Sequence, residues 1–141
     1  MKKMIAFLFI LSVMGCGSGF TRADFPKLII GEWKAVSFGS HYSAMHISLP
    51  ASFQFRKDNT YTQTFTETGT LKTRHGKYAL KDNGFIYQID FIQNSPSDAL
   101  ILGIITFHSE NEMTLKLANG FVRERPSGNR NGDEQVYKRV N

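Results

Sequence analysis

Cysteine, long apolar runs and runs of one charge are scarce in this sequence of 141 residues. Cys16 is the only cysteine, which excludes a disulfide within the chain. The apolar run 4–14 is shorter than the roughly 20 residues that a helix needs to span a bilayer. The net charge is +5, but there is no acidic run or long block of like charge, and we expect no nucleic-acid partner.

Motifs that mark catalytic and metal sites are also missing. The sequence has no Gly-x-Ser-x-Gly elbow, no His-Glu-x-x-His and no phosphate-binding Gly loop. His41 and His46 lie five positions apart, while His75 and His108 lie on separate segments, so we predict neither a metal site nor a cofactor. Because no nucleophile can be paired with a base, we predict that the protein is not an enzyme.

Aromatic residues, by contrast, are abundant. The chain has twelve Phe, five Tyr and one Trp, with 21% charged residues. This composition is typical of a packed globular protein rather than of a disordered segment. A length of 141 residues corresponds to one domain that can bury a core of its own.

The N-terminus has the order of parts found in a secretory signal. Lys2 and Lys3 give a positive start, the run 4–14 gives the apolar region, and the sequence VMGC ends at Cys16. VMGC resembles the lipobox of bacterial lipoproteins, in which a small residue precedes a cysteine that is acylated before cleavage. The alternative is a plain secretory signal with an incidental cysteine.

The lipobox resemblance implies a domain division and a location. Residues 1–15 are then a lipoprotein signal peptide, 16–24 a flexible tether and 25–141 the folded domain. Acyl chains such as palmitate on Cys16 would hold the protein in the lipid bilayer of the cell envelope. In Gram-negative sorting, an Asp after the cysteine retains a lipoprotein in the inner membrane. Gly17 stands at that position, so the outer membrane, facing the periplasm, is expected.

From residue 25 onward the sequence predicts short strands joined by turns. Residues 25–30 predict one helical turn, since Pro26 is tolerated at an early helix position. No apolar period of 3.6 residues persists for a long helix, and Asn83-Gly84 is a strong hairpin signal. We predict eight strands in series, with Gly76 as a bulge. They lie at 31–38, in two runs within 52–67, and at 70–80, 85–93, 99–108, 113–118 and 134–140.

A meander of eight strands hides its edges by closing into an antiparallel up-and-down barrel, which makes the predicted fold class all-β. Gly31 and Trp33 form a Gly-x-Trp at the start of the first strand, and this arrangement resembles the lipocalins and their calycin relatives. In that family an Arg of the last strand packs over the Trp and closes one end of the barrel. The resemblance implies this role for Arg139, with Arg125 as the alternative. Another β-sandwich with an ordinary core Trp remains the alternative fold.

The last strand is also similar to that of intracellular fatty-acid-binding proteins, which end in Arg-x-Tyr. The matching positions 135–137 read Gln-Val-Tyr, so the cation that holds a fatty carboxylate in that family is missing. This difference argues against carboxylate capture by that route.

The first predicted function is binding of a small hydrophobic or amphipathic ligand inside a membrane-anchored barrel. Phe85 shares a strand face with three of the candidate lining residues, and Asp90 and Gln88 share the other face. An outward position suits Asp90; a polar contact lining a cavity is the alternative. The candidate ligand-lining residues are Phe53, Phe55, Tyr87, Ile89, Phe91 and Tyr137.

The run 99–107 is apolar on both faces, whereas an antiparallel barrel strand normally exposes a polar outer face. Outward Leu100, Leu102 and Ile104 therefore need a cover, for which the candidates are the 41–51 connection, the tether, a second copy or the lipid surface. This strip gives the alternative function. A barrel filled by its own side chains would act as an interaction or structural subunit of the envelope, through a protein partner or self-association.

Overall fold

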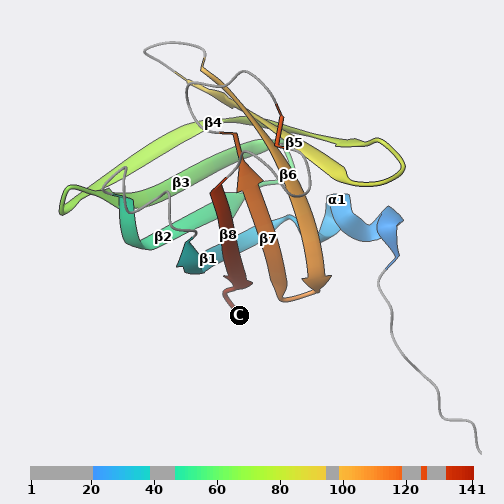
Figure 1. The fold of residues 1–141 in the computed structure, drawn as a ribbon, viewed down its shortest axis with the longest axis horizontal. Helices are drawn as coiled ribbons and strands as arrows, with labels where there is room; N and C mark the ends of the chain where they lie inside the picture. The colour runs from blue at the N-terminus through green and yellow to red at the C-terminus, as the bar shows by residue number, and fades with distance from the viewer. Residues whose placement is uncertain (1–20, 39–46, 95–98, 119–124, 127–132) are drawn as a thin grey trace, which may run out of the picture.

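The computed structural model describes residues 21–38, 47–94, 99–118, 125–126 and 133–141, apart from the side chains of 47–50 and 133. Within these ranges eight antiparallel strands pair in sequence order and close into a barrel (Figure 1). The predicted all-β, up-and-down, eight-stranded barrel is therefore confirmed. The strands are β1 (Gly31–Phe38), β2 (Ile47–Phe55), β3 (Thr60–Glu67), β4 (Thr70–Asp82), β5 (Tyr87–Gln93), β6 (Leu100–Ser109), β7 (Glu112–Leu117) and β8 (Asp133–Arg139).

A short helical segment precedes the barrel. A 3-10 turn, η1 (Arg22–Asp24), leads directly into α1 (Phe25–Leu28), where Pro26 occupies an early position that needs no N–H partner. Thr21 stabilises the start of this segment, because its backbone N and its Oγ1 donate to Asp24 Oδ2 at 2.9 and 2.7 Å. Three residues of the predicted tether thus form a helical turn.

The two ends of the barrel differ in what they carry. Successive strands run in opposite directions, so the turns after β2, β4 and β6 lie at one end and the strands β1, β3, β5 and β7 finish at the other. We call the first the helix end, because Phe25 and Leu28 of α1 pack against the core there, and the second the opposite end (Figure 1). The N-terminal segment therefore enters the barrel at the helix end.

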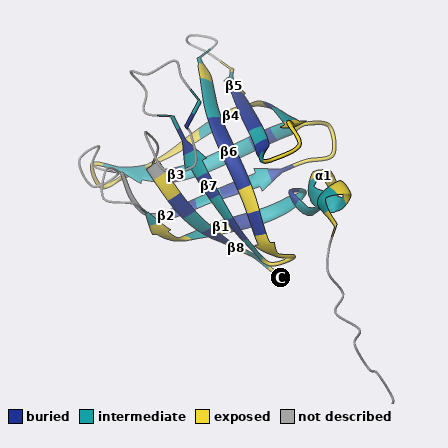
Figure 2. Cartoon of the chain, turned by 45° about the vertical axis from the view of Figure 1, so that its right-hand side comes forward, coloured by how far each residue is buried: buried dark blue, intermediate teal, exposed yellow. Residues whose placement is uncertain are grey.

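Aromatic rings fill the middle of the barrel, where inward-facing residues of several strands alternate with more exposed ones along the chain (Figure 2). Phe53 of β2 lies 5.3 Å from Phe91 of β5 and 5.6 Å from Tyr137 of β8, measured between ring centroids. Tyr61 of β3 lies 4.9 Å from Phe91. These contacts cross the barrel, so in this section the space inside it is taken by the chain's own side chains.

The barrel closes where the first and last strands meet. β1 and β8 are antiparallel, with Trp33 opposite Arg139 and Ala35 opposite Tyr137. The register shifts between Ala35 and Ser37, which leaves the rest of the seam paired. This pairing removes the free edges of the eight-stranded sheet.

Candidate functional site

Trp33 and Arg139 form a closed assembly at the helix end. The indole is 0% exposed, and its Nε1 donates to the Ile29 carbonyl at 2.9 Å. The Arg139 guanidinium carbon lies 4.4 Å from the centroid of the Trp33 ring, which is within cation–π range. The same guanidinium donates from Nη1 to the Ile30 carbonyl at 2.8 Å and from Nη2 to the Leu28 carbonyl. Arg139 thus covers the indole and donates to the carbonyl of the last α1 residue and to that of Ile30, just after the helix.

Gly31 is required beside this assembly for two reasons. Its φ of +136° is one that residues with a side chain rarely adopt, and a Cβ at this position would lie 2.7 Å from Arg139 Nη1. The structure therefore brings Gly31, Trp33 and Arg139 together. Arg125, the alternative partner for the Trp, lies elsewhere on the barrel.

Arg125 binds the outer face of β5 and β6. Its Nη1 donates to the Gly103 carbonyl at 2.7 Å and to the Ile89 carbonyl at 3.3 Å, and its Nη2 bonds to Asp90. Lys81 Nζ lies 3.0 Å from the other carboxylate oxygen of Asp90. Burial acts to raise the pKa of Asp90, but hydrogen bonds and charges from Arg125 and Lys81 outweigh it and hold this pKa below its usual value. Asp90 is therefore an outward, ion-paired carboxylate.

Replacing Asp90 with asparagine is expected to lower the free energy of unfolding by about 1–3 kcal/mol at pH 7, because Arg125 loses a charged partner. A folded-state pKa below the ordinary value means that this stabilisation is present above about pH 4 and is lost as the pH falls through the folded value. Urea unfolding at pH 7 and at pH 3 measures both effects. Glu112→Gln is the control, because its pair with Lys138 is exposed and 3.9 Å long and should contribute little. Equal stability of the Asp90 variant and the wild type at pH 7 would contradict the role of this ion pair.

The apolar strip predicted on β6 is only partly exposed. Leu100 is 58% exposed, Leu102 is half-buried and Ile104 is 8% exposed. Arg125, from the connection between β7 and β8, lies against this strand through its hydrogen bond to the Gly103 carbonyl. The apolar surface that stays exposed is therefore smaller than predicted. It consists of Leu100 and its cross-strand neighbour Ile92, and Ile92 is 41% exposed.

Polar side chains line the inside of the barrel toward the opposite end. Gln63 and Arg74 are paired in register, and Gln63 is also opposite Phe53, so both side chains lie on the inward face. The Arg74 guanidinium carbon lies 4.3 Å from the centroid of the Phe65 ring, which is 1% exposed. No described residue lies within hydrogen-bond or ion-pair distance of the Arg74 guanidinium. Glu67 is the nearby acidic residue: the pKa of its carboxyl lies below the usual value, mainly because of its hydrogen bond to Lys72, with a smaller contribution from the Arg74 charge. Burial raises the pKa of Tyr61, and the Arg74 charge opposes this rise, which places that charge near the tyrosine.

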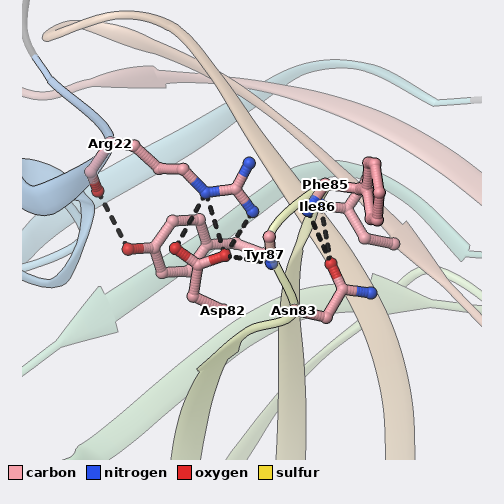
Figure 3. Close-up of polar contacts among 7 residues, drawn as sticks. Arg22, Asp82, Asn83, Phe85, Ile86 and Tyr87 are labelled. Carbon is pink, nitrogen blue, oxygen red and sulfur yellow. Dashed lines mark hydrogen bonds and ion pairs between the residues drawn. The ribbon is translucent and has the colours of Figure 1, made fainter.

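A groove lies at the helix end, between the N-terminal segment and the turn that joins β4 to β5. It has a volume of about 280 Å³. Arg22 and Tyr87 form one wall, and Figure 3 shows how both are held by neighbouring polar groups. The complete lining is Arg22, Phe25, Phe85, Ile86, Tyr87, Ile105 and Thr106.

The six candidate ligand-lining residues are all buried, but most contact one another rather than a cavity. Phe53, Phe55, Phe91 and Tyr137 belong to the aromatic cluster in the middle of the barrel. Tyr87 lies farther toward the helix end, 4.8 Å from the Phe25 ring. Phe85, expected on the same strand face, is instead in the turn before β5 and is 90% exposed.

The described residues include no cluster of three or more His, Cys, Asp or Glu side chains suited to a metal ion. His75 and His108 bond to Thr62 and Thr114 on neighbouring strands. His41, His46 and Cys16 lie outside the described residues. In the part of the chain that the structure covers, no helix has the length and apolar character needed to cross a membrane.

No protein-family model matches this chain, and no curated protein matches its sequence.

Proposed function

We propose that this chain is a bacterial envelope lipoprotein, anchored through Cys16, whose barrel binds one small amphipathic anion. The observation that carries the binding proposal is Arg74, an inward cation in the barrel wall. Its guanidinium lies over the buried Phe65 ring and has no acceptor among the described residues. An anionic head group would supply that acceptor, and a guanidinium binds carboxylate, sulfate or phosphate oxygens in pairs.

The filled middle of the barrel limits where such a ligand binds. Phe53, Phe91 and Tyr137 occupy the central section, so a ligand inside the barrel would bind toward one of its ends, and the Arg74 cation favours the opposite end. There the apolar surface of Phe65 lies beside Gln63 and Arg74, and the ion pair between Lys72 and Glu67 lies on the same strand face nearer the rim. This lining suits a short apolar chain with one anionic group more than a large neutral lipid.

The mature protein should therefore retain an anionic amphiphile when it is extracted from its own envelope. Native mass spectrometry of the wild type is expected to show the added mass, and Arg74→Gln is expected to reduce its occupancy by about 10–100-fold, the equivalent of one charge-assisted hydrogen-bond pair. Lys77→Gln is the matched control, because it removes the same charge from the outward face of the same strand. A wild-type protein without any retained mass, or retention that is equal in the Arg74 variant, would contradict the binding proposal.

A second candidate function rests on a different observation. Ile92 and Leu100 form an exposed apolar pair on the outer face of a barrel whose centre is already filled. This pair supports a role as an interaction or structural subunit of the envelope, through a protein partner or a second copy. Analytical ultracentrifugation of the wild type and of Leu100→Glu compares their association states. If the pair is an interface, the variant should associate less than the wild type. Identical association states, together with retained ligand in the wild type, would favour the first function over the second.

A further inference from the structure

The start of the described chain is fastened to the turn between β4 and β5. Arg22 Nε donates to both carboxylate oxygens of Asp82, at 2.9 and 2.8 Å (Figure 3). Tyr87 OH donates to the Arg22 carbonyl at 2.9 Å, and the Arg22 guanidinium carbon lies 5.2 Å from the centroid of the Tyr87 ring. The hydrogen bond from Arg22 holds the pKa of Asp82 below its usual value, so the pair stays charged to a lower pH than a free carboxyl would. The N-terminal segment and this turn are therefore joined by both side-chain and backbone contacts.

In the turn that carries Phe85, neighbouring side chains already accept hydrogen bonds from the backbone N–H groups. Asn83 Oδ1 accepts the N–H groups of Phe85 and Ile86 at 3.0 and 2.8 Å, and Asp82 Oδ1 accepts the N–H of Gly84 at 2.8 Å (Figure 3). Gly84 has a φ of +89°, which a glycine adopts without strain. Three successive amide donors thus need no water, so the tip of the turn can enter a less polar medium without leaving them unpaired. Phe85 itself is 90% exposed.

Chain length fixes how far this turn can lie from the proposed anchor. Residues 17–20 separate Cys16 from Thr21, and these five steps span at most about 18 Å even when fully extended. Thr21 directly precedes Arg22, which lines the same groove as Phe85 and Ile86. An acylated Cys16 would therefore hold the helix end of the barrel close to the bilayer surface and direct the opposite end away from it.

We propose that the helix end docks on the bilayer that holds the anchor, with Phe85 and Ile86 inserted at the boundary between head groups and acyl chains. The inference rests on the proposed lipid anchor at Cys16. Phenylalanine is suited to this depth, since apolar side chains of surface-bound proteins reach about 5–10 Å into that boundary. Docking at the helix end also directs the Arg74 end toward the aqueous compartment.

A single-thiol label tests this orientation on the intact lipoprotein. The thiol of an acylated Cys16 is blocked, so Phe85→Cys supplies the one reactive thiol, which is labelled with an environment-sensitive fluorophore. The protein is purified with its acyl chains and reconstituted into phosphatidylethanolamine–phosphatidylglycerol vesicles that contain lipids spin-labelled on the acyl chain. Leu71→Cys is the matched control, because Leu71 is also apolar and 63% exposed but lies on β4 beside the turn at the opposite end.

The label at position 85 is expected to emit at shorter wavelength in vesicles than in detergent-free buffer, and to be quenched at least about twofold by the spin-labelled lipids. The label at position 71 should show neither change. Vesicle flotation and the mass of the intact protein report the anchor separately. Equal, weak quenching at both positions in protein that floats and carries acyl chains would overturn the docking inference and leave the anchor intact. Protein that lacks acyl chains would overturn both the inference and the proposed function.

Discussion

Replacing Trp33 with alanine is expected to lower the free energy of unfolding by about 3–5 kcal/mol, the usual effect of truncating a fully buried aromatic residue. The indole is 0% exposed and contacts the Phe107 ring at 5.9 Å, so its removal leaves a cavity at the helix end. It also removes the donor to the Ile29 carbonyl and the ring under Arg139. A loss of this size approaches the whole stability of an ordinary domain. Urea unfolding followed by far-UV circular dichroism measures it, because the variant has no Trp to report by fluorescence.

Two further variants separate the parts of this effect. Trp33→Phe keeps a ring and loses the hydrogen bond to Ile29, so it should cost about 1–3 kcal/mol. Arg139→Ala should cost less than Trp33→Ala, and the double variant should cost less than the sum, because the two residues share one contact. If the loss of unfolding free energy in the double variant equals the sum of the two single losses, the contact between the guanidinium and the indole does not stabilise the protein. In the wild type, Trp33 fluorescence should be blue-shifted and move to longer wavelength on unfolding; native emission at the solvent-exposed wavelength would contradict its burial.

Replacing Cys16 with serine is expected to abolish membrane retention and the incorporation of radiolabelled palmitate. The reason is chemical: acylation needs the thiol, and Cys16 is the only one in the sequence. Two or more acyl chains anchor firmly where one chain binds only reversibly, so the expected change is from complete retention to release rather than a partial shift. Fractionation of the envelope and fluorography of the labelled protein give the two readouts.

Ser18→Ala is the control for this substitution, since it changes a nearby hydroxyl without touching the thiol. It should keep both palmitate and membrane retention. Gly17→Asp keeps the thiol as well and is expected to move the protein to the inner membrane of a Gram-negative host. Palmitate incorporation that persists in Cys16→Ser would remove the lipoprotein proposal.

The fold could be predicted from sequence because the signals for it are local. Alternating apolar residues and turn residues such as Asn83-Gly84 mark each hairpin separately, and eight hairpin-linked strands leave a closed barrel as the natural arrangement. The prediction of a bulge at Gly76 was wrong, because pairing with β3 and β5 is regular there. The glycine is needed for a different reason: a Cβ would lie 2.1 Å from the Ile92 carbonyl oxygen. The spacing of apolar residues along the sequence cannot reveal that two backbones approach this closely.

The polar sites were harder to predict because they join residues far apart in sequence. The bond between Arg22 and Asp82 spans 60 positions, and that between Arg125 and Asp90 spans 35. Nothing in either local sequence selects the partner. Arg74 could have been found, since it shares strand parity with the inward Tyr78 and therefore had to face the interior. Phe85 was misplaced because the side chain of Asn83 satisfies the amides that a longer β5 would have paired.

The seam between β1 and β8 has a consequence for the order in which the molecule folds. The hydrogen bond from Arg139 to Ile30 joins residues 109 apart, so the barrel can close only after nearly all of its strands have formed. Loop-closure entropy makes such long-range pairing slow, and until it occurs β1 and β7 both present unpaired edges. Folding is therefore expected to be slow for a domain of this length, and the chain should be most prone to aggregation before the seam has formed.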